Sequence, residues 1–340
     1  MKTVDLQALP APPSLMSALM AGFDAIANHI GLILFPVVLD LFLWFGPHLS
    51  LARLIDNLLN HMSSLPGADA SGTADLLSIS NQFWTMIAQR LNLLSVLRSY
   101  PVGIPSLMTS LQPVQTPSGS PVTFYIPSVL GVIGVWVLLT IFGLVGGTFY
   151  YGVVAQAALA GKVQWRLIFS GLPWSSLQVL SLALFWIALL LGISIPGSCV
   201  LALVSLTGLT AGTVGIFILA GLLIWILFPL LLSAHGIFVN RRKMWASVRD
   251  GMRLTRLTLP STGLLFLIII VLNEGLGLLW SVPGEASWLT IIGVMGHAFV
   301  TTALLATTFI YYRDADRWVQ KILLQAKLKS GASAGIAEQR

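Results

Sequence analysis

The chain has 340 residues, of which 56 % are hydrophobic and only 9 % are charged, and its mean hydropathy is +0.89. A soluble domain usually carries about 25 % charged residues, so this composition excludes an ordinary soluble protein and indicates a chain dissolved mainly in lipid. The net charge of +6 does not by itself indicate nucleic-acid binding, and the single cysteine, Cys199, excludes an intramolecular disulfide and a multi-cysteine metal site.

Six segments are apolar over the roughly 20 residues that a membrane-spanning helix needs. The predicted spans cover residues 27–47, 127–150, 175–195, 211–233, 261–282 and 288–311. We therefore predict an all-α, polytopic integral membrane protein with six transmembrane helices. Its predicted parts are an N-terminal segment at 1–26, a transmembrane domain at 27–312 and an amphipathic tail at 313–340 that is helical at first and then disordered.

The longest predicted loop, residues 49–126, follows the first span. Two stretches within it, 50–62 and 76–97, carry apolar residues at helical spacing. They predict two amphipathic helices that either pack together or lie on the membrane surface. Six prolines between positions 101 and 127 then exclude a regular helix or a central strand, so this part of the loop should be extended and stiff.

The lysines and arginines predict the orientation of the chain. With six spans, both termini and two of the loops share one side and hold fifteen of these residues, whereas the other side holds only Arg53, Arg90 and Arg98. Cytoplasmic loops carry an excess of lysine and arginine. We therefore expect both termini in the cytoplasm (N-in, C-in) and the long loop outside.

The loop at 234–260 contains the densest positive cluster, in the stretch RRKMWASVRDGMRLTR. On a helix, one stripe would hold Arg242, Arg249, Arg253 and Arg256. A neighbouring apolar face would hold Trp245, Val248, Met252 and Leu259. Such a helix can lie in the membrane interface, with its apolar face in acyl chains and its arginines at anionic headgroups. It would serve either as a dock for a lipid or a partner, or only as an anchor that fixes the topology.

Three ionisable residues, Asp40, Glu274 and His297, fall inside predicted spans at similar depth. Each costs about 2.5–3.5 kcal/mol at the centre of a spanning helix, so each needs a reason to be there. Glu274 and His297 are separated by a short loop and form the favoured pair, which could relay protons or bind a cation. The alternative is that each group is neutral or paired and only holds helices together.

Small residues in the second and sixth spans predict close helix packing. Gly143 and Gly147 form a G-x-x-x-G pair, which we assign to packing within the chain. The sixth span has a stripe that should be buried or line a cavity, made of Gly293, His297, Thr301, Leu304 and Thr308.

Motifs of the common catalytic sites are absent from the sequence. It contains no P-loop, no dinucleotide-binding glycine pattern after a strand, no H-E-x-x-H and no G-x-S-x-G. We therefore predict no catalytic residues, no metal site and no cofactor, and we expect the protein not to be an enzyme.

The segment at 229–272 resembles part of the membrane-domain superfamily that is attached to some bacterial glycerophosphodiester phosphodiesterases. In that region a helix ends, a short basic stretch follows and a new helix begins; the matching residues here are Ser247, Arg253, Leu254 and Thr255. The soluble phosphodiesterase domain has no counterpart in this chain. The resemblance therefore implies a multi-pass protein of the bacterial cytoplasmic membrane and not the enzyme activity.

The favoured function is that of a non-enzymatic integral membrane protein, a structural or accessory subunit of a membrane complex. Its expected partners are the lipid bilayer, anionic lipid headgroups and other membrane subunits, and not nucleic acid. One alternative is a small permease or ion-coupled transporter that uses Asp40, Glu274 and His297. Another is a lipid-active enzyme, for which no nucleophile is visible. A water-accessible cavity that reaches Glu274 would favour transport, and a close-packed core with a large exposed apolar flank would favour a subunit.

Overall fold

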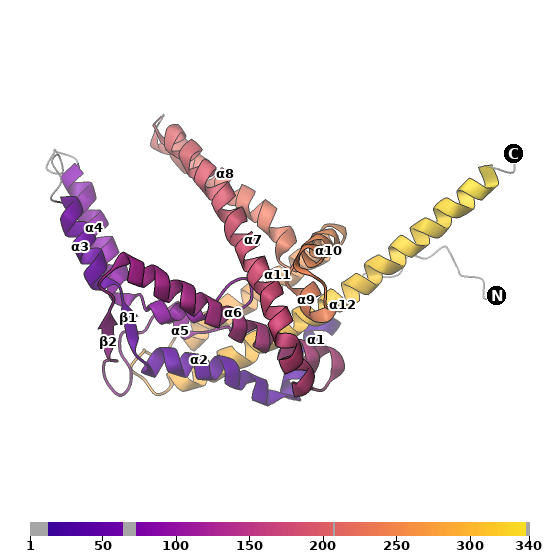
Figure 1. The fold of residues 1–340 in the computed structure, drawn as a ribbon, viewed down its shortest axis with the longest axis horizontal. Coiled ribbons are helices and arrows are strands. Elements are labelled where there is room, and N and C mark those ends of the chain that lie inside the picture. Colours follow the sequence, from indigo (N-terminus) through magenta and orange to yellow (C-terminus); the bar gives the residue numbers. More distant parts are fainter. Residues whose placement is uncertain (1–12, 64–72, 207, 338–340) are drawn as a thin grey trace. The chain divides into compact units, whose positions relative to one another are not determined.

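The structure, a computed structural model, describes residues 13–63, 73–206 and 208–337. Most of these residues lie in helices, as Figure 1 shows, and five helices are long and apolar enough to cross a membrane. The number rises to six if two shorter helices joined at a sharp bend are counted as one span. The prediction of a nearly all-α protein with several apolar spanning helices is thus confirmed.

The chain divides into two compact units, each assembled from separate stretches. The first unit comprises residues 1–29, 152–270 and 303–340, and the second comprises 30–151 and 271–302. Three helices contribute residues to both units: α6 (Val129–Ala160), α11 (Leu259–Trp280) and α12 (Thr290–Ala337). The ranges of the first unit contain fifteen of the lysines and arginines, and those of the second contain three. The two units therefore separate the lysines and arginines into the same two groups as the six predicted spans do.

The first predicted span, residues 27–47, is not one straight helix. It is replaced by α1 (Leu15–Ala27), η1 (Ile30–Ile33) and α2 (Leu34–Phe45), with a bend of 88° between α1 and the segment that follows. Helix α1 was not predicted. It begins at Ser14, whose side chain accepts a hydrogen bond from the backbone of Ser17, and it packs through Gly22 against the backbone of α12 at Ala303 and Thr307.

The segment between α2 and α6 contains two helices that pack together, α3 (Ala52–Ser63) and α4 (Thr73–Arg90). This confirms one of the two predicted arrangements; residues 64–72, between the two helices, lie outside the described part of the chain. The remaining elements are short: β1 (His48–Ser50), η2 (Leu93–Leu97), α5 (Met108–Leu111) and β2 (Thr123–Tyr125). Strands β1 and β2 pair in parallel, a contact that the sequence did not predict.

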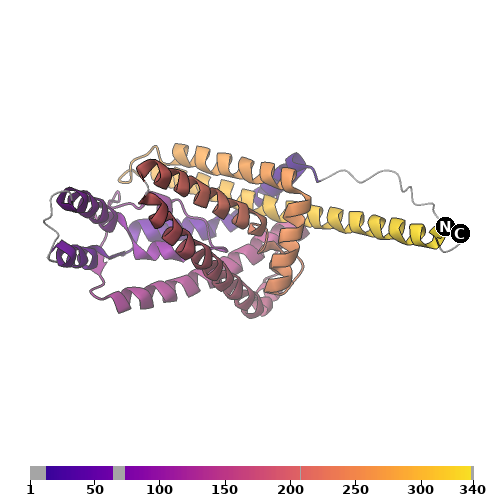
Figure 2. The same cartoon turned by 90° about the horizontal axis from the view of Figure 1, so that it is seen from above.

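Helices α7 (Trp165–Ser205) and α8 (Leu209–Leu227) lie side by side as a hairpin (Figure 1 and Figure 2). Helix α7 runs through Pro173 and Pro196 and includes the predicted span at 175–195. Its 41 residues extend about 60 Å, twice the roughly 30 Å of a bilayer's hydrocarbon core. In its most apolar 18-residue window no residue is buried, whereas 61 % of the residues are buried in the corresponding window of α12.

The last predicted span and the tail form a single helix, α12, which Figure 2 shows as one unbroken rod. The boundary expected at residue 313 therefore does not exist as a break in structure. The sequence SGASAGIAEQR, expected to be disordered, is helical up to Ala337, and residues 338–340 lie outside the described part. Between α8 and α11 the chain forms η3 (Phe228–Leu230), α9 (His235–Val239) and α10 (Met244–Leu257).

Candidate functional site

Asp40 is fully buried on α2 and its carboxylate accepts three hydrogen bonds. The Ser106 hydroxyl donates to Oδ1 at 2.5 Å, the backbone N–H of Met108 to the same oxygen at 3.0 Å, and the N–H of Leu107 to Oδ2 at 3.1 Å. These donors lie at the start of the short helix α5, where backbone N–H groups have no partner within the helix. Asp40 therefore fastens to α2 the segment at 46–128, between α2 and α6, which we call the outer segment after its predicted side of the membrane.

Arg98 supports the same segment from the other side. One of its guanidinium nitrogens donates at 3.3 Å both to the carbonyl oxygen of Ser106 and to the hydroxyl of Ser110. The polar groups around Ser106 thus form hydrogen bonds with one another. The sequence predicted Asp40 as a site but gave no signal for Ser106, which lies 66 residues away.

Glu274 and His297 do not form the predicted pair. The Glu274 side chain is exposed on α11, and its carboxylate accepts a hydrogen bond from the neighbouring Asn273 at 3.0 Å. His297 is buried on α12, and within the described part of the chain its Nδ1 has no hydrogen-bond partner. Asp40, the third residue, bonds only to the outer segment, so the structure does not bring the three candidates into one site.

The two small-residue patterns pack within the chain. On α12, the predicted stripe is buried except for Thr301, which is half-buried. On α6, a Cβ atom at Gly143 would lie 2.6 Å from the carbonyl oxygen of Leu97, and one at Gly147 would lie 2.7 Å from the Cα of Gly103. The G-x-x-x-G pair therefore accommodates the irregular backbone of the outer segment instead of a second helix.

The basic helix α10 packs on protein through a face that was not predicted. Of the predicted apolar face only Val248 is buried, whereas Trp245 and Leu259 are exposed and Met252 is half-buried. Its buried residues are Met244, Ser247, Val248, Gly251, Leu254 and Thr255. Three of them, Ser247, Gly251 and Thr255, are small and recur every four residues, which lets α10 approach the backbone of Leu232 and Ser233 closely. Val248 was expected in acyl chains and is instead buried in this contact.

The four arginines predicted to face headgroups differ in their surroundings. Arg242 is half-buried and forms an ion pair with Asp250. Arg249, Arg253 and Arg256 are exposed, and no described residue forms an ion pair with any of these three. The exposed arginines keep their full charge available to anions, whereas that of Arg242 is used within the protein.

A buried polar cluster beneath α10 was missed by sequence analysis. The Ser247 hydroxyl donates to the carbonyl oxygen of Ser233 at 2.5 Å, and His235 Nε2 lies 2.8 Å from the hydroxyl of Thr308. The His235 ring stacks on that of Tyr312 with centroids 5.7 Å apart. Ser247 and Thr255, two of the four residues named for the expected resemblance, thus belong to the small and polar face through which α10 packs.

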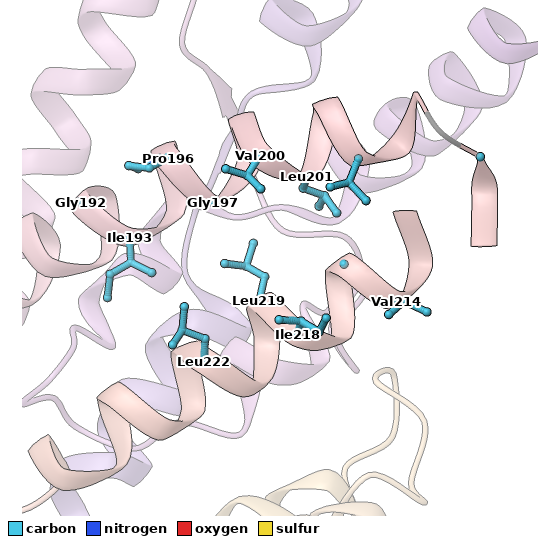
Figure 3. A pocket seen from close by; sticks show the side chains of 13 residues that line it. Gly192, Ile193, Pro196, Gly197, Val200, Leu201, Val214, Ile218, Leu219 and Leu222 are labelled. Carbon is cyan, nitrogen blue, oxygen red and sulfur yellow. The ribbon is translucent and has the colours of Figure 1, made fainter. Parts of the chain in front are cut away.

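Two apolar cavities lie along the α7–α8 hairpin. The first has a volume of about 1000 Å³ and is lined only by uncharged residues; Figure 3 shows Ile193 of α7 and Leu219 and Leu222 of α8 on its walls. The second, of about 650 Å³, lies further along the same two helices and is also bordered by Met252 and Arg256 of α10. Asp40, Glu274 and His297 line neither cavity.

His48, in β1 beyond the end of α2, gives a test of the outer segment. Burial lowers the pKa of its imidazole below 6.5, although a hydrogen bond with Leu43 and the charge of Glu285 act in the opposite direction. The unfolded chain therefore binds a proton that the folded chain resists, and the free energy of unfolding should fall as the pH drops from 7 to 5. Detergent unfolding of His48→Gln should show a flatter pH profile; a profile unchanged from wild type would contradict this role.

Comparisons with known proteins identify no relative: no family model, no curated protein and no solved structure matches the chain. Within the described residues, no group of three or more His, Cys, Asp and Glu side chains could hold a metal ion. The assignment of a function therefore depends on the geometry alone.

Proposed function

We propose that the protein is a non-enzymatic integral membrane protein that serves as a structural or accessory subunit of a membrane complex. The observation that carries the proposal is the exposure of the α7–α8 hairpin. In the apolar windows of these two spanning segments 0 % and 6 % of the residues are buried, against 11 % in α6 and in α11 and 61 % in α12. Two long helices that bury so little of their own surface offer an apolar flank to the transmembrane helices of a partner.

The placement of the intramembrane polar residues supports this function over that of an ion-coupled transporter. Transport would need Asp40, Glu274 and His297 to line a shared, hydrated path. Instead, three donors occupy the Asp40 carboxylate, and Glu274 is exposed on a different helix from the buried His297. Their roles fit the structural alternative, in which polar groups hold segments together.

We further propose six spans with both termini in the cytoplasm of a bacterium, counting α1 with α2 as one broken span. The fifteen-to-three division of lysine and arginine supports this topology. It puts the exposed arginines of α10 at the level of anionic lipid headgroups, which are the proposed lipid partners. The resemblance of residues 229–272 to the phosphodiesterase-associated membrane-domain superfamily is part of the same proposal, without the enzyme activity.

Photocrosslinking tests the subunit function. A crosslinking amino acid at Phe217, exposed on α8, should join the protein to one membrane protein in a fixed ratio, because that flank is proposed to carry the partner. The control is Leu267 on α11, which is also exposed, at 56 % against 73 % for Phe217. Equal crosslinking to the same proteins from both positions, or to lipid alone from Phe217, would contradict the proposal.

A further inference from the structure

The cavity beside α10 differs from the larger one in having a charged group at its edge. Its walls are apolar and aromatic, formed chiefly by Phe185 and Leu189 of α7, Trp225 of α8 and Phe228 of η3. Met252 and Arg256 of α10 close one side. A molecule that fills this space must therefore be largely hydrocarbon and must tolerate, or pair with, a guanidinium group.

Arg256 is free to pair with an anion. Its side chain is exposed, and no described residue forms an ion pair with it. Arg253 and Arg249 are exposed on the same helix, so the positive potential next to the cavity is not neutralised locally. The same site thus combines an apolar chamber with an unmatched positive charge, which is the complement of an anionic amphiphile.

We propose that this cavity binds one acyl chain of an anionic phospholipid from the cytoplasmic leaflet, with the lipid phosphate paired to Arg256. The inference rests on the proposed topology, which puts α10 at the cytoplasmic headgroup level. The cavity follows the chain from Gly221 to Leu230, nine residue-to-residue steps or about 14 Å at helical rise. One leaflet supplies about half of the roughly 30 Å hydrocarbon core, so a single chain of that leaflet matches the depth.

Lipid retention measures the proposal directly. The full chain is reconstituted in nanodiscs of phosphatidylcholine with one tenth phosphatidylglycerol, released into mild detergent and analysed by native mass spectrometry. The lipid that stays bound should be enriched in phosphatidylglycerol by about fivefold over the supplied ratio, which corresponds to the roughly 1 kcal/mol that one basic residue contributes at an anionic surface. Retention at the supplied ratio would overturn the proposal.

Paired substitutions separate the charge from the general basicity of α10. Arg256→Gln should abolish the enrichment, whereas Arg249→Gln, which removes the same charge from the same helix but does not line the cavity, should preserve it. Equal loss in both variants would overturn a defined site. Millimolar glycerol 3-phosphate, which has the phosphate without the chain, should leave the bound lipid in place; displacement by it would show that the chain adds nothing.

A second pair tests the chamber itself. Nothing lies within 4 Å of a Cβ atom built at Gly221 or at Gly192, and each of the two glycines lines one of the cavities, so a leucine is introduced at either position. Gly221→Leu fills the cavity beside α10 and should reduce retention of both lipids, whereas Gly192→Leu enters the other cavity and should not. The opposite ranking would overturn the proposal. Lipid retention is measured independently of the crosslinking that tests the subunit function and of the thiol labelling that tests the topology. A wrong lipid site can therefore be told apart from a wrong function or a wrong topology.

Discussion

Asp40→Ala should lower the free energy of unfolding by about 3 kcal/mol or more, because it removes the acceptor of three buried donors. The backbone N–H groups of Leu107 and Met108 cannot turn toward another acceptor, since they are fixed at the start of α5. Asp40→Asn should cost less, because one amide oxygen can still accept. Chemical unfolding in detergent, followed by tryptophan fluorescence, measures both changes.

The matched control is Glu274→Gln. Glu274 is also predicted to lie within a spanning helix, but its side chain is exposed and its hydrogen bond is with the adjacent Asn273. The substitution should change the free energy of unfolding by no more than about 0.5 kcal/mol. If Asp40→Ala were as mild as Glu274→Gln, Asp40 would not be the fastening of the outer segment, and an ion-binding role would regain support.

Gly147→Val should destabilise the protein by about 2–3 kcal/mol through overpacking. A Cβ atom there would lie 2.7 Å from the Cα of Gly103 and 2.8 Å from the carbonyl oxygen of Val102. Both neighbours are backbone atoms, so relief requires the outer segment to move away from α6. Thermal unfolding in detergent measures the loss, and limited proteolysis around residue 103 should become faster.

Gly134→Val on the same helix is the control for valine in α6. Nothing lies within 4 Å of a Cβ atom at Gly134, and the residue is exposed. The two variants share the same change in helix propensity, so only the steric contact separates them. Similar melting temperatures for both variants would mean that the outer segment does not pack closely against α6 at Gly147.

Sequence reasoning predicted the spanning segments because hydrophobicity over 20 residues is a strong local signal. It located the apolar regions of the five long helices, but it missed the continuity of α7 through Pro173 and Pro196. Proline removes a hydrogen bond inside a helix, and neighbouring groups in a membrane protein can compensate for that loss. The sharp bend after α1 was also missed, although Ser14 is a residue type typical of a helix start.

The candidate residues were found more readily than their partners. Asp40 was conspicuous as a charge within an apolar run, whereas Ser106 is one of many serines in an irregular loop. Only the three-dimensional fold brings that serine to α2. Depth along the helices suggested that Glu274 and His297 meet, but equal depth does not fix the direction in which each side chain points.

For α10, three of the four arginines in the predicted stripe are exposed, but the face that packs on protein was not predicted. Large residues such as Trp245 and Met252 dominated the predicted face. The contact in fact uses Ser247, Gly251 and Thr255, whose small size permits close approach. Trp245 instead remains exposed and lies edge-on to Phe185 of α7 with ring centroids 5.4 Å apart. A hydropathy-weighted pattern undervalues small residues that favour tight helix contacts.

The topology is tested most directly by thiol labelling in intact cells. Cys199 is the only cysteine, so Cys199→Ser provides a background for single cysteines at Arg249 on α10 and at Ser120 in the outer segment. Both native side chains are exposed. With a membrane-impermeant maleimide, we expect labelling of Ser120→Cys, and labelling of Arg249→Cys only after the membrane is permeabilised. Labelling of Arg249→Cys from outside intact cells would contradict the proposed topology.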